Sequence, residues 1–78
     1  MTDPLLELFA EALELDAADL SDTTAPENTP EWDSLKAMEI VGLLEDEFDL
    51  SLSTRDIMKM RSIGLAREVL VSKGVGGL

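Results

Sequence analysis

The segment Ser34–Phe48 constrains the fold more than any other part of the chain, because its apolar residues recur at the spacing of an α-helix. The expected inward stripe consists of Ala37, Ile40, Val41, Leu44 and Phe48. Asp33, directly before the segment, is a favoured N-cap residue. A helix with one apolar stripe is stable only when that stripe packs against other elements. We therefore expect a helix over Ser34–Phe48 within a core of further helices.

A second amphipathic helix is predicted over Pro4–Leu15. Asp3 is its expected N-cap, and Pro4 suits the first helical position because its fixed φ matches the helix there. The residues expected to face the core are Leu5, Leu8, Phe9, Ala12 and Leu13. The glutamates between them, Glu7, Glu11 and Glu14, are expected to be solvated surface.

Two more helices are predicted in the C-terminal half. Ser53 and Asp56 have the spacing of a capping box, which opens a short helix through about Met60. Ser62 is expected to cap the last helix, which runs to about Lys73. Its inward residues are Ile63, Ala66, Val69 and Leu70. The segment 48–52 alternates apolar and polar residues but is too short to found a sheet, so we expect an extended connector.

The segment 16–33 is rich in Asp, Thr, Pro and Asn and predicts a long loop, with one helical turn expected at Ala17–Leu20. Leu20 and Trp32 are expected to plug the core, and Trp32 is expected to pack rather than to bind cargo. Connections of this length are often functional, so the loop is also a candidate for partner contact. The chain thus predicts an all-α four-helix bundle over residues 1–73, with a short third helix and a flexible tail at 74–78.

Composition limits the chemistry of this chain of 78 residues. The absence of cysteine excludes disulfides and thiol nucleophiles, and the absence of histidine leaves a serine nucleophile without its usual base. Asp16, Asp19 and Asp22 do not follow the spacing of an EF-hand. The sequence therefore predicts neither an enzyme nor a metal site.

The net charge of −11 predicts partners with basic surfaces and argues against nucleic-acid or membrane partners. The residues after Met1 lack the basic region of a signal peptide, and no apolar stretch approaches the length of a membrane span. We therefore expect a cytoplasmic monomer.

The tripeptide Asp33-Ser34-Leu35 places one hydroxyl at the start of a helix. Free N–H groups and the positive end of the helix dipole at that position suit a phosphate ester. The alternative is that Ser34 is merely a cap, but Asp33 can fill that role. Ser34 is therefore a candidate attachment site.

The sequence EWDSLKAMEIV at residues 31–41, continued by EDEF at 45–48, resembles the acyl and peptidyl carrier proteins. These proteins carry 4′-phosphopantetheine on the serine of an Asp-Ser-Leu motif. The resemblance covers nearly the whole chain, and it implies an acyl-carrier-type bundle with the cofactor on Ser34. It also implies contact between Asp33 and the modifying enzyme. Lys36 replaces an acid of many fatty-acid carriers, which argues modestly against a housekeeping fatty-acid carrier.

The function implied by this resemblance is that of a stand-alone carrier, which holds an acyl or aminoacyl group as a thioester. Its expected partners are a phosphopantetheinyl transferase, a loading ligase and downstream transferases with basic docking surfaces. The candidate docking residues are Leu35, Lys36, Met38, Glu39, Gly42, Glu45 and Asp46. Gly42 leaves space either for the arm or a partner, or for a closely packed helix. The alternative function is that of an acidic regulatory or decoy protein that binds a basic partner without modification.

Overall fold

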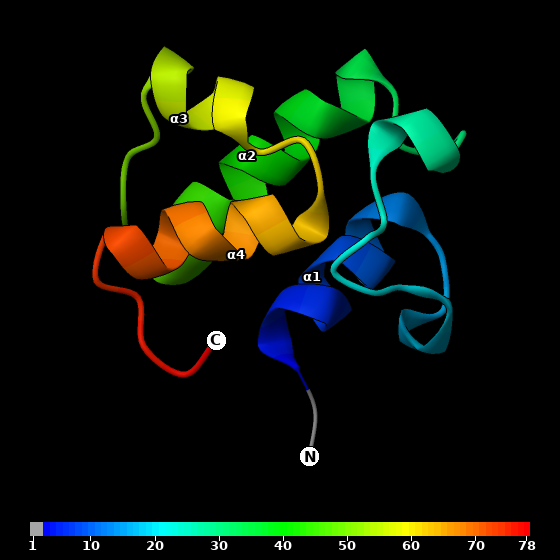
Figure 1. The fold of residues 1–78 in the computed structure, drawn as a ribbon, viewed down its shortest axis with the longest axis horizontal. Coiled ribbons are helices and arrows are strands. Elements are labelled where there is room, and N and C mark those ends of the chain that lie inside the picture. The colour runs from blue at the N-terminus through cyan, green and yellow to red at the C-terminus, as the bar shows by residue number, and fades with distance from the viewer. Residues whose placement is uncertain (1–2) are drawn as a thin grey trace.

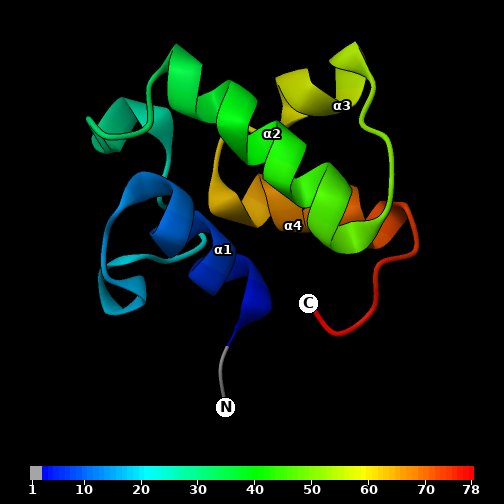
Figure 2. The same ribbon diagram turned by 180° about the vertical axis from the view of Figure 1, so that it is seen from behind.

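The computed structural model describes residues 3–78, which form four α-helices and two short 3₁₀-helices, with no strand in that range. The elements are α1 (Pro4–Leu13), η1 (Ala17–Asp19), η2 (Pro26–Asn28), α2 (Ser34–Phe48), α3 (Thr54–Lys59) and α4 (Ile63–Ser72). α1 packs against α2 and α4, and α3 packs against α4. Figures 1 and 2 place α3 and the first turns of α2 at the edge farthest from both termini. The predicted all-α four-helix fold is confirmed.

The core is formed by the apolar stripes of three helices, by two residues of the long loop, and by Leu52 and Met60, which lie before and after α3. The largest fully buried side chains are Phe9, Leu5, Leu13, Ile40, Leu44, Ile63 and Leu70. Leu20 and Trp32 are also buried, as predicted. The Trp32 ring lies 5.0 Å from that of Phe9, at an interplanar angle of 54°. Aromatic pairs of this kind contribute about 0.5–1.5 kcal/mol beyond area burial, so Trp32 anchors the loop directly before α2.

The predicted end of the first helix at Leu15 is wrong by two residues. Glu14 takes a left-handed conformation with φ of 59°, and the N–H of Leu15 bonds back to the Ala10 carbonyl at 2.9 Å. This turn ends α1 at Leu13 and still directs Leu15 onto the core. The turn predicted at Ala17–Leu20 is present as η1. The helix η2 was not predicted, although Pro26 at its first position was a signal for it.

The long loop is fixed onto the start of α4 by backbone hydrogen bonds. The N–H of Ile63 donates to the Thr24 carbonyl at 2.9 Å, and the N–H of Gly64 donates to the Asp22 carbonyl at 3.0 Å. A Cβ atom on Gly64 would lie 3.0 Å from that same carbonyl oxygen. Glycine is therefore what allows the loop to approach α4 so closely.

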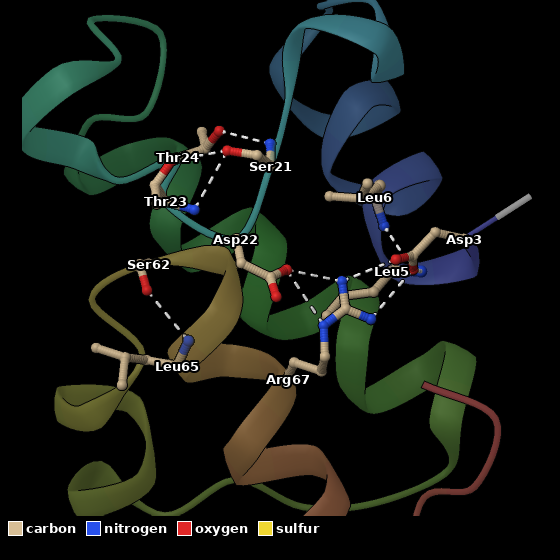
Figure 3. A network of polar contacts seen from close by, with 10 residues as sticks. All are labelled: Asp3, Leu5, Leu6, Ser21, Asp22, Thr23, Thr24, Ser62, Leu65 and Arg67. Atoms are coloured by element: carbon tan, nitrogen blue, oxygen red, sulfur yellow. Dashed lines mark hydrogen bonds and ion pairs between the residues drawn. The ribbon is translucent and has the colours of Figure 1, made fainter.

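A second contact between loop and helices is made by Arg67 of α4, whose side chain is 18% exposed. Its guanidinium lies 2.8 Å from the Asp3 carboxylate and 2.9 Å from that of Asp22 (Figure 3). The hydrogen bond to Asp3 raises the pKa of Arg67, and it lowers the pKa of Asp3. This cluster of Asp3, Asp22 and Arg67, called the arginine clamp below, joins the start of α1, the loop and α4.

The short helix α3 is attached to α4 by an ion pair. The Lys73 ammonium lies 2.8 Å from the Asp56 carboxylate, and hydrogen bonding to Lys73 and then to Ser53 lowers the pKa of Asp56 to about 2. Asp56 and Ser53 also form the predicted capping box. Beyond α4, Val75 and Leu78 pack against the core, so part of the predicted flexible tail touches the bundle. No helix in residues 3–78 is long and apolar enough to cross a membrane.

Candidate functional site

Ser34 is the first residue of α2, and it is exposed. Asp33 is the N-cap, as predicted: its carboxylate accepts the N–H of Lys36 at 2.9 Å, and its carbonyl accepts the N–H of Ala37 at 2.9 Å. Within residues 3–78 no hydrogen bond involves the Ser34 hydroxyl. Because Asp33 performs the capping, the Ser34 hydroxyl is left free for chemistry.

The backbone at the start of α2 is open to an anion. The N–H groups of Ser34 and Leu35 donate to no atom of residues 3–78. Free N–H groups at a helix start, together with the helix dipole, stabilise a negative charge that lies close to them. The donor set therefore fits a phosphodiester attached to Ser34. In the same residues no cluster of His, Cys, Asp or Glu is suited to hold a metal ion.

Large apolar side chains are exposed next to Ser34. Leu35 is 70% exposed and Met38 is 74% exposed. Glu39 and Asp46 are exposed on the same helix, outside its buried stripe. The outer face of α2 thus combines apolar and acidic side chains, as a docking surface for a basic partner requires.

Gly42 also lies on the outer face of α2, two helical turns beyond Leu35. A Cβ atom built on Gly42 would meet no atom within 4 Å. The alternative that a neighbouring helix packs closely on Gly42 is therefore wrong. The other alternative, that the space serves the arm or a partner, stays a prediction.

Three of the predicted docking residues, Lys36, Glu39 and Glu45, have contacts within the bundle. The Lys36 ammonium lies 3.3 Å from the Glu39 carboxylate and 3.9 Å from that of Glu14, so it faces α1. The Glu45 carboxylate accepts the N–H of Leu52 at 2.8 Å and thereby holds the connector after α2. No local pattern indicated the bond between Glu45 and Leu52, because only the folded chain brings those residues together. Docking by Lys36, Glu39 or Glu45 would compete with these contacts.

The apolar residues of α3 were not among the predicted docking residues. Ile57 is 39% exposed and Met58 is 71% exposed. Both belong to α3, which lies at the edge of the molecule that also carries the first turns of α2 (Figure 1). The sequence offered only a weak signal, because no inward stripe could be assigned to this short helix. The candidate surface therefore extends from α2 onto α3.

This chain is similar to known carrier proteins over most of its length. The family model described as "Phosphopantetheine attachment site" matches residues 3–66. A curated relative is the polyketide-8 synthase acyl carrier protein 2 of Streptomyces avermitilis. It is 35% identical over 69 residues, which cover 88% of this chain and 79% of the relative.

Two solved structures have similar folds. Rv0033 of Mycobacterium tuberculosis, described as an acyl carrier protein, superposes with a TM-score of 0.79 at 23% identity, over 90% of this chain and 93% of that one. The holo acyl carrier protein NE2163 of Nitrosomonas europaea superposes with a TM-score of 0.78 at 21% identity, over 91% and 92% of the two chains. At these identities the likeness shows the shared fold.

Proposed function

This chain belongs to the phosphopantetheine-attachment family of acyl carrier proteins, and on that premise we propose that Ser34 is the residue that bears its 4′-phosphopantetheine. Members of the family are carriers rather than enzymes, and the cofactor is held covalently. The observation that carries the proposal is the start of α2. There an exposed hydroxyl stands beside two backbone N–H groups that have no partner within residues 3–78.

In the proposed attachment, the Ser34 oxygen attacks the phosphorus that links pantetheine to the rest of coenzyme A. A new phosphoester bond forms, the pyrophosphate bond breaks, and adenosine 3′,5′-bisphosphate leaves. The hydroxyl proton passes to a base of the transferase, because this chain contains no histidine to accept it. The N–H groups of Ser34 and Leu35 would be available to donate to a phosphodiester on Ser34.

The attached arm supplies a terminal thiol, which holds the cargo as a thioester. We propose an acyl cargo within a biosynthetic pathway. Support comes from the Streptomyces avermitilis relative, which is named for polyketide synthesis. The arm keeps this cargo at high local concentration near each docked enzyme. Leu35, Met38, Glu39 and Asp46 are the proposed docking contacts on α2, since all four are exposed.

Intact mass spectrometry tests the attachment site. The chain is incubated with coenzyme A, magnesium ion and a broad-specificity phosphopantetheinyl transferase. The wild type is expected to gain the mass of one phosphopantetheine, and Ser34→Ala is expected to gain none. Ser51→Ala is the matched control, because Ser51 is also exposed. Modification of Ser34→Ala would contradict the proposed site, and an unmodified wild type would favour the acidic regulatory alternative.

A further inference from the structure

The basic residues of this acidic chain are unevenly distributed. Three of the six, Lys36, Arg67 and Lys73, form ion pairs within the bundle. The other three lie on α3 or just after it: Arg55, Lys59 and Arg61. All three are exposed, and none forms an ion pair with any residue of the described chain 3–78. A protein of net charge −11 thus has uncommitted positive charge in one place.

The same place carries exposed apolar side chains. Arg55 and Lys59 are four residues apart and therefore share one face of α3, next to Met58. Asp56, the acid of this helix, pairs with Lys73, the residue directly after α4. We call Arg55, Ile57, Met58, Lys59 and Arg61 the α3 patch.

The α3 patch borders a hollow of about 1020 Å³ between α3 and the long loop. Ile57, Met58 and Arg61 line this hollow from the α3 side, and Asp22 and Glu27 line it from the loop. Lys59 borders a smaller hollow that Glu68 of α4 also lines. The facing acids are too far away to form ion pairs, because no nitrogen of the patch lies within 4.0 Å of a carboxylate oxygen.

The α3 patch and the start of α2 lie at the same edge of the molecule (Figures 1 and 2). The exposed charges next to Leu35 and Met38 in the chain are the acids Asp33 and Glu39, and the partly buried Lys36 pairs with Glu39. On α3 the exposed charges are basic. One edge therefore presents two apolar clusters with charges of opposite sign around them.

We propose that the α3 patch docks partner proteins that present carboxylates and an apolar side chain to α3, beside the basic surface they present to α2. A uniformly basic partner face would be repelled by Arg55 and Lys59, whereas a face of mixed sign meets its complement on both helices. The proposal rests on the proposed function only in placing partners at this edge. The patch acts without Ser34, so the two can fail separately.

A bipolar peptide tests the orientation that the charges require. The probe is a synthetic amphipathic helix with leucines along one face, glutamates at one end and lysines at the other. It is titrated at low salt into isotope-labelled Ser34→Ala protein, with a spin label on either end. A label at the glutamate end is expected to broaden the amide signals of Arg55, Met58 and Lys59. A label at the lysine end is expected to broaden those of Leu35 and Glu39.

Charge variants test the strength of the contact. Arg55→Gln combined with Lys59→Gln removes two exposed ion pairs, which is expected to weaken peptide binding about two- to thirtyfold. Ala18→Glu combined with Gly76→Glu is the matched control. It makes the same change in net charge at exposed positions away from this edge, and Gly76 has room for a side chain. The control is expected to bind nearly as the wild type does.

Three results would overturn the proposal. The control could weaken binding as much as the patch variant, which would mean that only net charge matters. An all-lysine peptide with the same leucines could contact Arg55 and Met58 equally well, which would deny any charge preference. A single-stranded oligonucleotide could bind the patch more tightly than the peptide, which would show that the patch binds phosphate groups rather than a protein partner. Thermal unfolding of each variant shows whether it is folded.

Discussion

The starts of α2 and α4 are built from the same local parts but are used differently. Each begins after a polar N-cap, Asp33 or Ser62, whose side chain accepts the third N–H of the helix. At α4 the first two N–H groups bond to carbonyls of the long loop. At α2 the corresponding N–H groups, of Ser34 and Leu35, bond to no residue of the described chain.

The difference shows that capping alone does not decide what a helix start does. At α4 the covering loop converts free donors into tertiary hydrogen bonds, which hold residues 22–24 in place. At α2 the chain arrives from the buried Trp32 and leaves the donors facing outward. One start therefore stabilises the fold, and the other remains able to bind the phosphodiester that the proposed attachment would create.

The largest expected effect comes from Gly64, the glycine that allows the long loop to cover the start of α4. Gly64→Ala places a Cβ atom 3.0 Å from the backbone oxygen of Asp22, and backbone cannot move aside as a flexible side chain can. We expect a loss of about 1–3 kcal/mol in the free energy of unfolding, the usual range for overpacking. In a domain of this size, each kcal/mol lowers the melting temperature by about 4–8 °C. Thermal unfolding followed by circular dichroism measures it.

Gly42→Ala is the matched control, because Gly42 is also helical but has no atom near its missing Cβ. The same substitution there is expected to raise stability by up to about 1 kcal/mol, since alanine favours the helix over glycine. A loss of stability in Gly64→Ala together with a gain in Gly42→Ala would support the comparison between the two helix starts. A stabilising Gly64→Ala would show that the loop does not depend on close approach to α4.

The second prediction removes the cap from each start. Asp33→Ala and Ser62→Ala should each cost about 0.5–2 kcal/mol in the free energy of unfolding, because each frees one N–H group. Only Asp33→Ala is expected to slow the addition of phosphopantetheine, since it disturbs the start that carries Ser34. The rate is measured by intact mass at a temperature where both variants are folded. Equal rates of modification for the two variants would show that the cap at α2 does not affect the modification.

The helices themselves could be predicted because their signals are local. Asp33, Ser53 and Ser62 were assigned as N-caps from sequence, and the structure shows all three in that role. The exposed position of Ser34 also followed from its neighbour, because a capping Asp33 leaves the serine without a structural task. The end of the first helix was missed, since a glutamate at Glu14 gives little warning of a left-handed turn.

Contacts between distant residues could not be predicted in the same way. Gly42 was predicted to be the helical glycine that needed space, yet the crowded one is Gly64. Both glycines interrupt a helical pattern, and only the path of the loop distinguishes them. Likewise, Arg67 contacts two acids that are far away in the chain, and no spacing rule covers such pairs.

The smallest expected effect is a pH dependence of stability at the start of α4, which the long loop covers. The arginine clamp also holds the loop there. The hydrogen bond from Arg67 lowers the pKa of Asp3 below its ordinary value of 3.8. A carboxylate with a lowered pKa in the folded state contributes stability that is present above the unfolded pKa and is lost as pH falls through the folded pKa. Arg67→Met removes this contribution while keeping most of the apolar stem.

We therefore expect the difference in melting temperature between wild type and Arg67→Met to be constant near neutral pH and to narrow as pH falls below about 4. The comparison between the two proteins cancels the protonation of the acids outside the arginine clamp, which affects both alike. Lys73→Met serves as a second test at α3, because hydrogen bonding to Lys73, ahead of that to Ser53, is the largest cause of the lowering of the pKa of Asp56 to about 2. Its difference from wild type should keep narrowing down to about pH 2, the pKa of Asp56 in the folded protein. Curves that stay parallel from neutral pH to pH 2 would show that Arg67 acts by packing, and that the loop over α4 is held by its backbone bonds and Gly64 alone.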